Sequence, residues 1–102
     1  MDKSLSLLGM ACRAGKLALG HDAALDSLKR GKSSLRVICS DSSQRLVREF
    51  ARSVDFYKSE APVEKISATQ EQLSAHLPKK VGVISVEDGG FADRFLQLSR
   101  QE

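Results

Sequence analysis

The sequence has no long hydrophobic run. None of its apolar stretches approaches the ~18 residues that a membrane-spanning helix needs. Residues 1–16 also lack the basic start and the small-residue cleavage site of a secretory signal peptide. We therefore expect a soluble, cytoplasmic chain.

Cysteine and proline are scarce. Cys12 and Cys39 are the only two cysteines, too few and too far apart for a zinc site or a disulfide framework. Both lie in apolar-patterned segments, so we predict buried free thiols and no bound metal. Pro62 and Pro78, the only prolines, stand where the apolar periodicity breaks, and we interpret both as element boundaries.

The length and composition fit one globular domain. The chain has 102 residues, of which 41% are hydrophobic and 28% are charged. This balance excludes a disordered tail and a collagen-like fibre, and two separate cores would each be undersized. We therefore predict a single domain over residues 1–102.

Apolar periodicity predicts helices that alternate with strands. The strands are expected at residues 16–20, 35–39, 62–66 and 81–86. Helices are expected near residues 4–15, 22–31, 41–54, 69–77 and 91–98. Strict alternation, with strands that are apolar on both faces, predicts a three-layer α/β/α sandwich around a central sheet.

Local signals predict where several helices begin and end. The first two helices should each end at a glycine in the C′ position, namely Gly15 and Gly31. Two other helices should begin with capping boxes, one formed by Asp41 with Gln44 and one by Thr69 with Gln72. A turn over residues 88–90 should lead into the last helix.

The net charge of +3 is unevenly distributed. Residues 1–52 hold ten Lys or Arg against five Asp or Glu, whereas residues 53–102 hold six against eight. The helix predicted over residues 41–54 places Arg45, Arg48 and Arg52 on one side. Such a basic half either attracts nucleic-acid phosphates or forms an ordinary solvated surface, and the charge alone does not decide between them.

The sequence contains no catalytic motif. The segments at Gly9–Lys16 and Gly31–Ser33 each miss the spacing of a phosphate-binding P-loop. Asp22 and Asp26 share one helix face beside His21, as a general acid–base pair would. A favourable interaction with the helix dipole and simple solvation explain these carboxylates better, so we predict that the chain is not an enzyme.

The junction at Gly20 is the most informative position. A glycine between a strand and a helix leaves backbone amides exposed at the positive end of the helix, where they can hold a phosphate or a base edge. Around this junction the sequence resembles the L-seven-Ae/L-thirty-e ribosomal-protein family, specifically its small bacterial relatives. The matching segments cover the chain in order, at Leu7–Lys16, around Gly20, at Cys39–Asp41 and at Val86–Ala92.

The resemblance implies a three-layer sandwich with a four-stranded mixed sheet, no cofactor, and recognition of kink-turn RNA. In the family, the contacts come from a Gly-x-Asn-Glu-x-x-Lys motif at the start of the second helix and from an apolar loop before the last strand. Gly20 matches the glycine, whereas Asp22, Ala23 and Asp26 replace the Asn, Glu and Lys. An ionised Asp only accepts hydrogen bonds and repels phosphate, so these replacements predict RNA binding with weaker kink-turn recognition.

We therefore predict a monomeric RNA-binding protein that acts on ribosomal or other structured RNA. The candidate RNA-binding residues are Arg13, Lys16, Gly20, His21, Asp22, Leu77, Pro78, Lys79 and Lys80. The alternative is a protein-interaction module of the same fold that has lost RNA recognition. Its partner would meet the Arg45, Arg48 and Arg52 face or the acidic second half of the chain.

Overall fold

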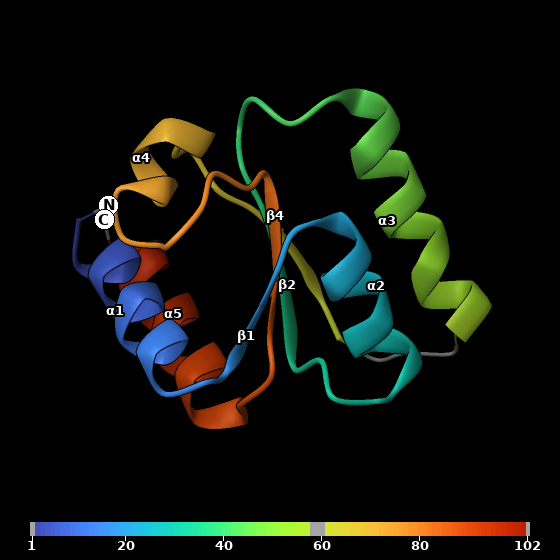
Figure 1. Cartoon of the computed structure of the whole chain (residues 1–102), viewed down its shortest axis with the longest axis horizontal. Coiled ribbons are helices and arrows are strands. Elements are labelled where there is room, and N and C mark those ends of the chain that lie inside the picture. The colour runs from blue at the N-terminus through green and yellow to red at the C-terminus, as the bar shows by residue number, and fades with distance from the viewer. Residues whose placement is uncertain (1, 58–60, 102) are drawn as a thin grey trace.

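The computed structural model describes residues 2–57 and 61–101, in which five helices alternate with four strands as predicted (Figure 1). The elements in chain order are α1 (Asp2–Arg13), β1 (Leu17–Leu19), α2 (His21–Lys29), β2 (Leu35–Ile38), α3 (Gln44–Tyr57), β3 (Val63–Lys65), α4 (Gln70–Ser74), β4 (Val83–Val86) and α5 (Gly89–Gln101).

The four strands form one mixed sheet in the order β1-β4-β2-β3. Strand β4 is antiparallel to both of its neighbours, with Leu17 and Leu35 each opposite Val86. Strand β3 pairs in parallel with β2 at the edge, where Arg36 lies opposite Val63. An edge position is the place where a preceding proline costs least, which accounts for Pro62. The predicted mixed sheet is confirmed.

Helices cover both faces of the sheet, so the predicted three-layer sandwich is confirmed. Helices α1, α4 and α5 lie on one face, and α2 and α3 lie on the other (Figure 1). Alternate residues of each buried strand point to opposite layers: Val37 packs with Leu8 and Phe95, whereas Ile38 packs with Leu28. This alternation buries both faces of β2, one lined by Leu35 and Val37 and the other by Arg36 and Ile38.

Helices α1 and α2 end as predicted, at glycines with a positive φ. Gly15 has a φ of 73° and Gly31 a φ of 71°, values that glycine adopts without a Cβ clash. The amide of Lys16 donates to the carbonyl of Ala11 (2.9 Å), which closes α1 in a Schellman motif. The same pattern closes α2.

Helix α4 begins with the predicted capping box. The hydroxyl of Thr69 accepts from the Gln72 amide (3.2 Å), and the Gln72 side chain accepts from the Thr69 amide (2.9 Å). Helix α5 begins slightly earlier than predicted, because Asp88 caps it by accepting from the Phe91 amide (2.8 Å). Gly89 is therefore already helical.

The predicted cap of α3 is wrong. Helix α3 begins at Gln44, and the hydroxyl of Ser43 accepts from the Leu46 amide (3.1 Å), so Ser43 is the capping residue. The Asp41 carboxylate instead accepts from the Gln70 amide (2.9 Å), at the start of α4. Residues 40–42 form a turn and a bend that move Asp41 away from the helix and leave Ser43 next to it.

Both cysteines are free. Cys39 is fully buried, as predicted, and Cys12 is partly buried. Burial, reinforced by the negative charge of Asp41, raises the pKa of the Cys39 thiol to about 11. Within the described residues, no cluster of His, Cys, Asp or Glu is arranged to hold a metal ion. No helix in the same residues is long and apolar enough to cross a membrane.

Candidate nucleic-acid interface

Four connections between elements meet at one end of the sheet, which we call the loop end. They are the turn at Gly20 between β1 and α2, and the segments at residues 39–43, 66–69 and 75–82. Strands β1, β2 and β3 finish at this end and β4 begins there, because β4 alone runs in the opposite direction. Segments far apart in the sequence are therefore neighbours.

The Gly20 turn leaves the start of α2 without a side-chain cap. Gly20 has a φ of 93° and a ψ of 169°, a conformation that is essentially restricted to glycine. Its amide donates to the Val83 carbonyl (3.0 Å), which fixes the turn to β4. No side chain caps α2, and the positive end of a helix is a place where an anion or a base edge can bind.

The connection between α4 and β4 lies directly beside this turn. A Cβ added at Gly20 would lie 3.8 Å from Cγ1 of Val81, an ordinary van der Waals contact. The structure therefore places Val81, at the base of this connection, next to the Gly20 turn.

Hydrogen bonds anchor the base of that connection. The Gly82 carbonyl accepts from the Cys39 amide and from the Ser42 hydroxyl, both at 2.9 Å. The Val81 amide donates to the Ser74 hydroxyl (3.3 Å). The tip of the connection is more open: Leu77 is partly buried, and the other tip residues are exposed, namely Pro78, Lys79 and Lys80. The α4–β4 connection therefore has a base held by hydrogen bonds and a more open tip that carries both apolar and cationic side chains.

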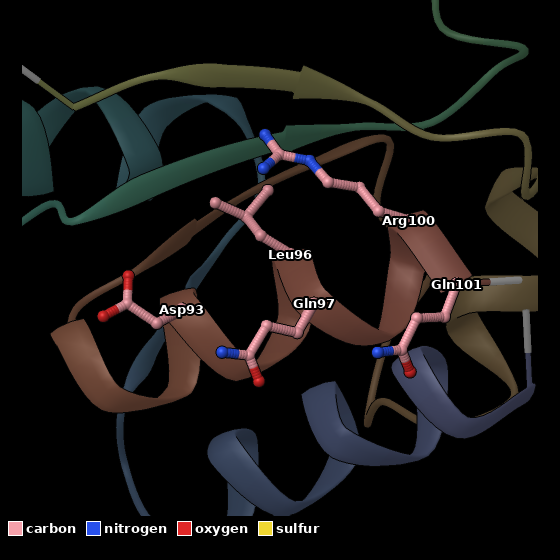
Figure 2. A pocket seen from close by; sticks show the side chains of 5 residues that line it. All are labelled: Asp93, Leu96, Gln97, Arg100 and Gln101. Carbon is pink, nitrogen blue, oxygen red and sulfur yellow. The ribbon is translucent and has the colours of Figure 1, made fainter.

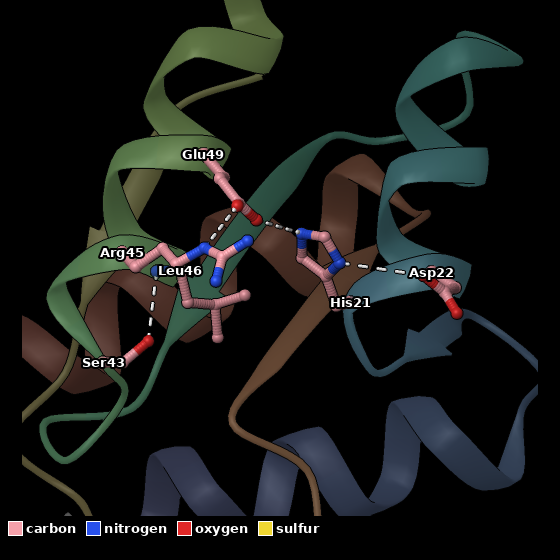
Figure 3. Close-up of polar contacts among 6 residues, drawn as sticks. All are labelled: His21, Asp22, Ser43, Arg45, Leu46 and Glu49. Carbon is pink, nitrogen blue, oxygen red and sulfur yellow. Dashed lines mark hydrogen bonds and ion pairs between the residues drawn. The ribbon is translucent and has the colours of Figure 1, made fainter.

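His21 turns towards α3. Its Nε2 lies 3.4 Å from Oε2 of Glu49, and Oε1 of Glu49 accepts a hydrogen bond from Nε of Arg45 (3.1 Å). Figure 3 shows this chain of contacts across the gap between α2 and α3, with the side chain of Asp22 on the other side of the imidazole. Nδ1 of His21 is 3.7 Å from Oδ1 of Asp22, whose side chain is fully exposed.

Asp26 does not join this cluster. Its Oδ2 pairs with Nε of Arg30 at 3.0 Å, one turn further along α2. Of the three groups considered for acid–base chemistry, His21 therefore lies between Glu49 and Asp22, and Asp26 is paired with Arg30. Among the described residues, Asp22 and Asp26 do not converge on one site.

Arg13 and Lys16, the two predicted RNA-binding cations that precede Gly20 in the sequence, lie in different places. A Cβ added at Gly9 would lie 3.1 Å from the His76 carbonyl oxygen and 3.6 Å from Nη1 of Arg13. Arg13 therefore lies beside the start of the α4–β4 connection. Lys16 precedes β1, and its carbonyl accepts from the Glu87 amide (2.8 Å).

Lys16 is thus at the opposite end of β1 from Gly20. The three residues of β1 lie between the two positions and separate them by about 13 Å along the strand. Eight of the nine candidate residues lie on or beside the loop end, and Lys16 does not. Glu49 was not predicted to belong to this site, because helical spacing alone does not show that its carboxylate reaches α2.

Another surface feature lies along α5. A hollow of about 470 Å³ follows one side of α5, and Figure 2 shows the five side chains that line it. They are Asp93, Leu96, Gln97, Arg100 and Gln101. All come from a single helix, and they include one acidic and one basic side chain only. The hollow offers no grouping of nucleophile, acid and base.

No family model matches the chain. Its fold is shared with other α/β proteins of known structure. A Bacillus halodurans protein of unknown function superimposes with a TM-score of 0.86 and 27% identity, over 98% of this chain and 99% of that one. A Giardia lamblia 15.5kD RNA binding protein superimposes with a TM-score of 0.73 and 17% identity, over 95% and 84% of the two chains. This second likeness shows the fold alone.

Two relatives detected by sequence carry the same name. RNA-binding protein YlxQ of Bacillus subtilis (strain 168) is 27% identical over 93 residues, which is 90% of each chain. RNA-binding protein YlxQ of Enterococcus faecium is 25% identical over 96 residues, which is 94% of this chain and 90% of that protein. The chain is therefore similar, over nearly its full length, to proteins named as RNA-binding.

Proposed function

We propose that this protein is a non-catalytic RNA-binding protein whose RNA-binding surface is the loop end. The similarity to the YlxQ proteins supports RNA as the ligand. The contact between the Gly20 turn and Val81 is the structural observation that carries the proposal. In this proposal, the uncapped start of α2, the apolar tip and the two lysines form one continuous RNA-binding surface.

Each part of this surface matches a different part of a structured RNA. Duplex RNA hides its base edges in a deep, narrow groove, and a bulge or kink frees a base from the stack. Leu77 and Pro78 offer apolar area to such a base. Lys79 and Lys80 face its phosphates, and the amides after Gly20 can bind either a phosphate or a base edge.

The resemblance to the L-seven-Ae/L-thirty-e family suggests a kink-turn or a related bent RNA as the ligand. The residues at three positions of the family motif indicate that this chain is less selective for the kink-turn than the family is. Asp22 is a fully exposed acceptor where the family has an amide. Ala23 has no polar side chain, and Asp26 is already paired with Arg30. We infer that the protein binds structured RNA with little selectivity for the standard kink-turn.

The absence of catalysis is part of the same proposal. His21 contacts Glu49, and Asp26 contacts Arg30, so neither side chain is directed at a shared reaction centre. The uncapped amides and the lysines at the loop end bind anions without breaking bonds. We further propose that the protein acts as a monomer in the cytoplasm, on ribosomal or other structured RNA and without a cofactor.

Sequencing the RNA that crosslinks to the protein in its native cell tests the proposal. Enrichment of one structured RNA is the expected result, and recovery of a protein partner without RNA would favour the alternative of a protein-interaction module. A titration of that RNA across salt concentrations provides the second measurement. The logarithm of the affinity should fall with the logarithm of the salt concentration by ~0.7 to 0.9 for each phosphate contacted. Affinity that does not respond to salt would contradict the proposal.

A further inference from the structure

Helix α3 carries an exposed row of arginines, which we call the arginine face. Arg45, Arg48 and Arg52 are spaced by three and four residues, so they lie on one side of the helix, and all are exposed. Leu46 and Val47, on another side of α3, pack against the core beneath it. The arginine face is therefore directed away from the sheet.

The arginine face begins at the loop end. Ser43, which caps α3, belongs to the segment that meets the other connections there. Arg45 is joined to His21 through Glu49, by contacts of 3.1 and 3.4 Å (Figure 3). From that point α3 runs along the side of the molecule (Figure 1). The arginine face thus continues the surface proposed to bind RNA.

Two of the three arginines of this face have no side-chain partner among the described residues. Arg45 pairs with Glu49, whereas no ion pair or side-chain hydrogen bond joins Arg48 or Arg52 to another described residue. Arg48 has no acidic residue three or four positions away in either direction. Elsewhere the chain does pair such cations, as with Arg30 and Asp26 at 3.0 Å.

The chemistry of the arginine face fits phosphate better than protein. The centre of a protein interface is depleted of charge and enriched in aromatic and other large apolar side chains. Among the described side chains, the one exposed large hydrophobic residue is Met10, which lies on α1. An interface with nucleic acid is instead dominated by cations that contact phosphates. From Arg45 to Arg52 the helix rises about 10 Å, a length over which one strand of a duplex presents about three phosphates.

We propose that the arginine face is a second RNA contact, which holds the phosphate backbone of the stem that flanks the RNA feature bound at the loop end. This inference rests on the proposed function. It adds a separate surface with a different role, because the loop end contacts bases and local phosphates, whereas the arginine face contacts duplex phosphates regardless of sequence.

The test compares three variants with the wild type. The first is R48Q/R52Q, which removes two charges and keeps side chains suited to a helix. Arg45 is left in place because its loss would free Glu49. The matched control is R94Q/R100Q, which removes the same charge from the exposed side of α5, in the other helical layer. A third variant, R48K/R52K, restores the charge, and thermal unfolding verifies that every chain is folded.

Each chain is titrated with the RNA recovered from the crosslinking experiment, with its flanking stem intact, over a range of salt concentrations. R48Q/R52Q should bind about tenfold more weakly near physiological salt and should reduce the salt slope by about 1.5. R94Q/R100Q should match the wild type, and R48K/R52K should recover most of the affinity.

The outcomes separate this inference from the proposed function. If R48Q/R52Q binds the RNA with the same affinity and the same salt slope as the wild type, the inference is overturned and the proposed function still stands. An equal loss in R48Q/R52Q and R94Q/R100Q would also overturn it, because net charge would then be the cause. A wild-type chain that binds no structured RNA would overturn the proposed function itself.

Discussion

Nε2 of His21 and Oε2 of Glu49 lie 3.4 Å apart, and this contact joins the first residue of α2 to the second turn of α3. The same carboxylate accepts a hydrogen bond from Arg45. Glu49 therefore lies between the loop end and the arginine face. It holds the two surfaces together, and its negative charge opposes phosphate binding at both.

The variant Glu49→Gln should bind structured RNA more tightly. Glutamine keeps the size of the side chain and a hydrogen-bond acceptor for Arg45, and it removes a charge that repels phosphate. We expect a gain of about two- to fivefold at low salt, measured by RNA titration, with a smaller gain at high salt because the repulsion is screened. Glu87→Gln, at the other end of the sheet, is the matched control. An equal gain in both variants would assign the effect to net charge.

The variant Gly20→Ala should lower both stability and RNA affinity. The backbone of Gly20 has a φ of 93°, and placing a Cβ there costs roughly 1–3 kcal/mol of the free energy of unfolding. The strain also moves the amides that follow. Chemical denaturation and RNA titration measure the two effects. Gly31→Asn is the control, because asparagine tolerates the φ of 71° found there. A Gly20→Ala chain of wild-type stability would show that the turn is not constrained.

The double variant Lys79→Ala and Lys80→Ala tests the tip of the α4–β4 connection. Both side chains are exposed, so stability should stay within ~0.5 kcal/mol of the wild type. RNA binding should weaken, and the salt slope should fall by about one to two units. The double variant Lys16→Ala and Lys32→Ala removes equal charge far from the loop end and should change neither. Unchanged RNA binding in the first variant would remove the tip from the site.

The fold was predictable because its signals are local. Apolar periodicity defines each helix through the residues that the helix itself buries. Gly15 and Gly31 end their helices through backbone conformations that only a few neighbouring residues determine. The cap of α3 was not predictable in this way, since Asp41 and Ser43 both offer an oxygen, and the loop between them decides which oxygen meets the helix.

Features that depend on distant contacts escaped prediction. Arg36 lies fully buried in the sheet, where its Nη2 donates to the carbonyl of Ala61 (2.9 Å), 25 residues away in the chain. Burial lowers the pKa of its guanidinium. Lys16 is only four positions from Gly20 in the sequence, but the extended strand between them places the two residues at opposite ends of β1. The contact of Glu49 with α2 likewise follows from packing alone.

The Cys39 thiol should make stability depend on alkaline pH. Its pKa is raised from 9.0 to about 11, because the thiol is buried and lies near Asp41. Above pH 9 the unfolded chain loses this proton and the folded chain keeps it, so the free energy of unfolding should fall between pH 9 and 11. The loss attributable to this thiol is about 2 to 3 kcal/mol.

Denaturation of the wild type and of Cys39→Ala, both under reducing conditions, isolates this contribution, because the other titrating groups are common to the two chains. The variant is less stable at pH 8 through its lost side-chain volume, and its curve should be flatter above pH 9. Parallel curves in the two chains would show that the thiol ionises as readily in the folded protein as in the unfolded one.

Restoring the family motif should strengthen kink-turn recognition. The triple variant Asp22→Asn, Ala23→Glu and Asp26→Lys supplies the amide, the carboxylate and the cation at positions along the first turns of α2. Base-edge contacts are worth ~1–3 kcal/mol each, so we expect a gain of about tenfold or more for a standard kink-turn. The gain is measured by titrating two RNAs, a standard kink-turn and a control in which the G·A pairs that flank the kink-turn bulge have been replaced.

One of the three substitutions should also destabilise helix α2. Asp26→Lys removes the ion pair with Arg30 and places two cations four residues apart, which destabilises a helix by a few tenths of a kcal/mol. The single variant Asp26→Lys measures that cost separately, and Arg30→Gln combined with the triple variant relieves it. Equal affinity of the folded triple variant for the two RNAs would show that α2 does not dock on the RNA in the register that the resemblance implies. A gain confined to the kink-turn would establish both the register and the uncapped start of α2 as the site of recognition.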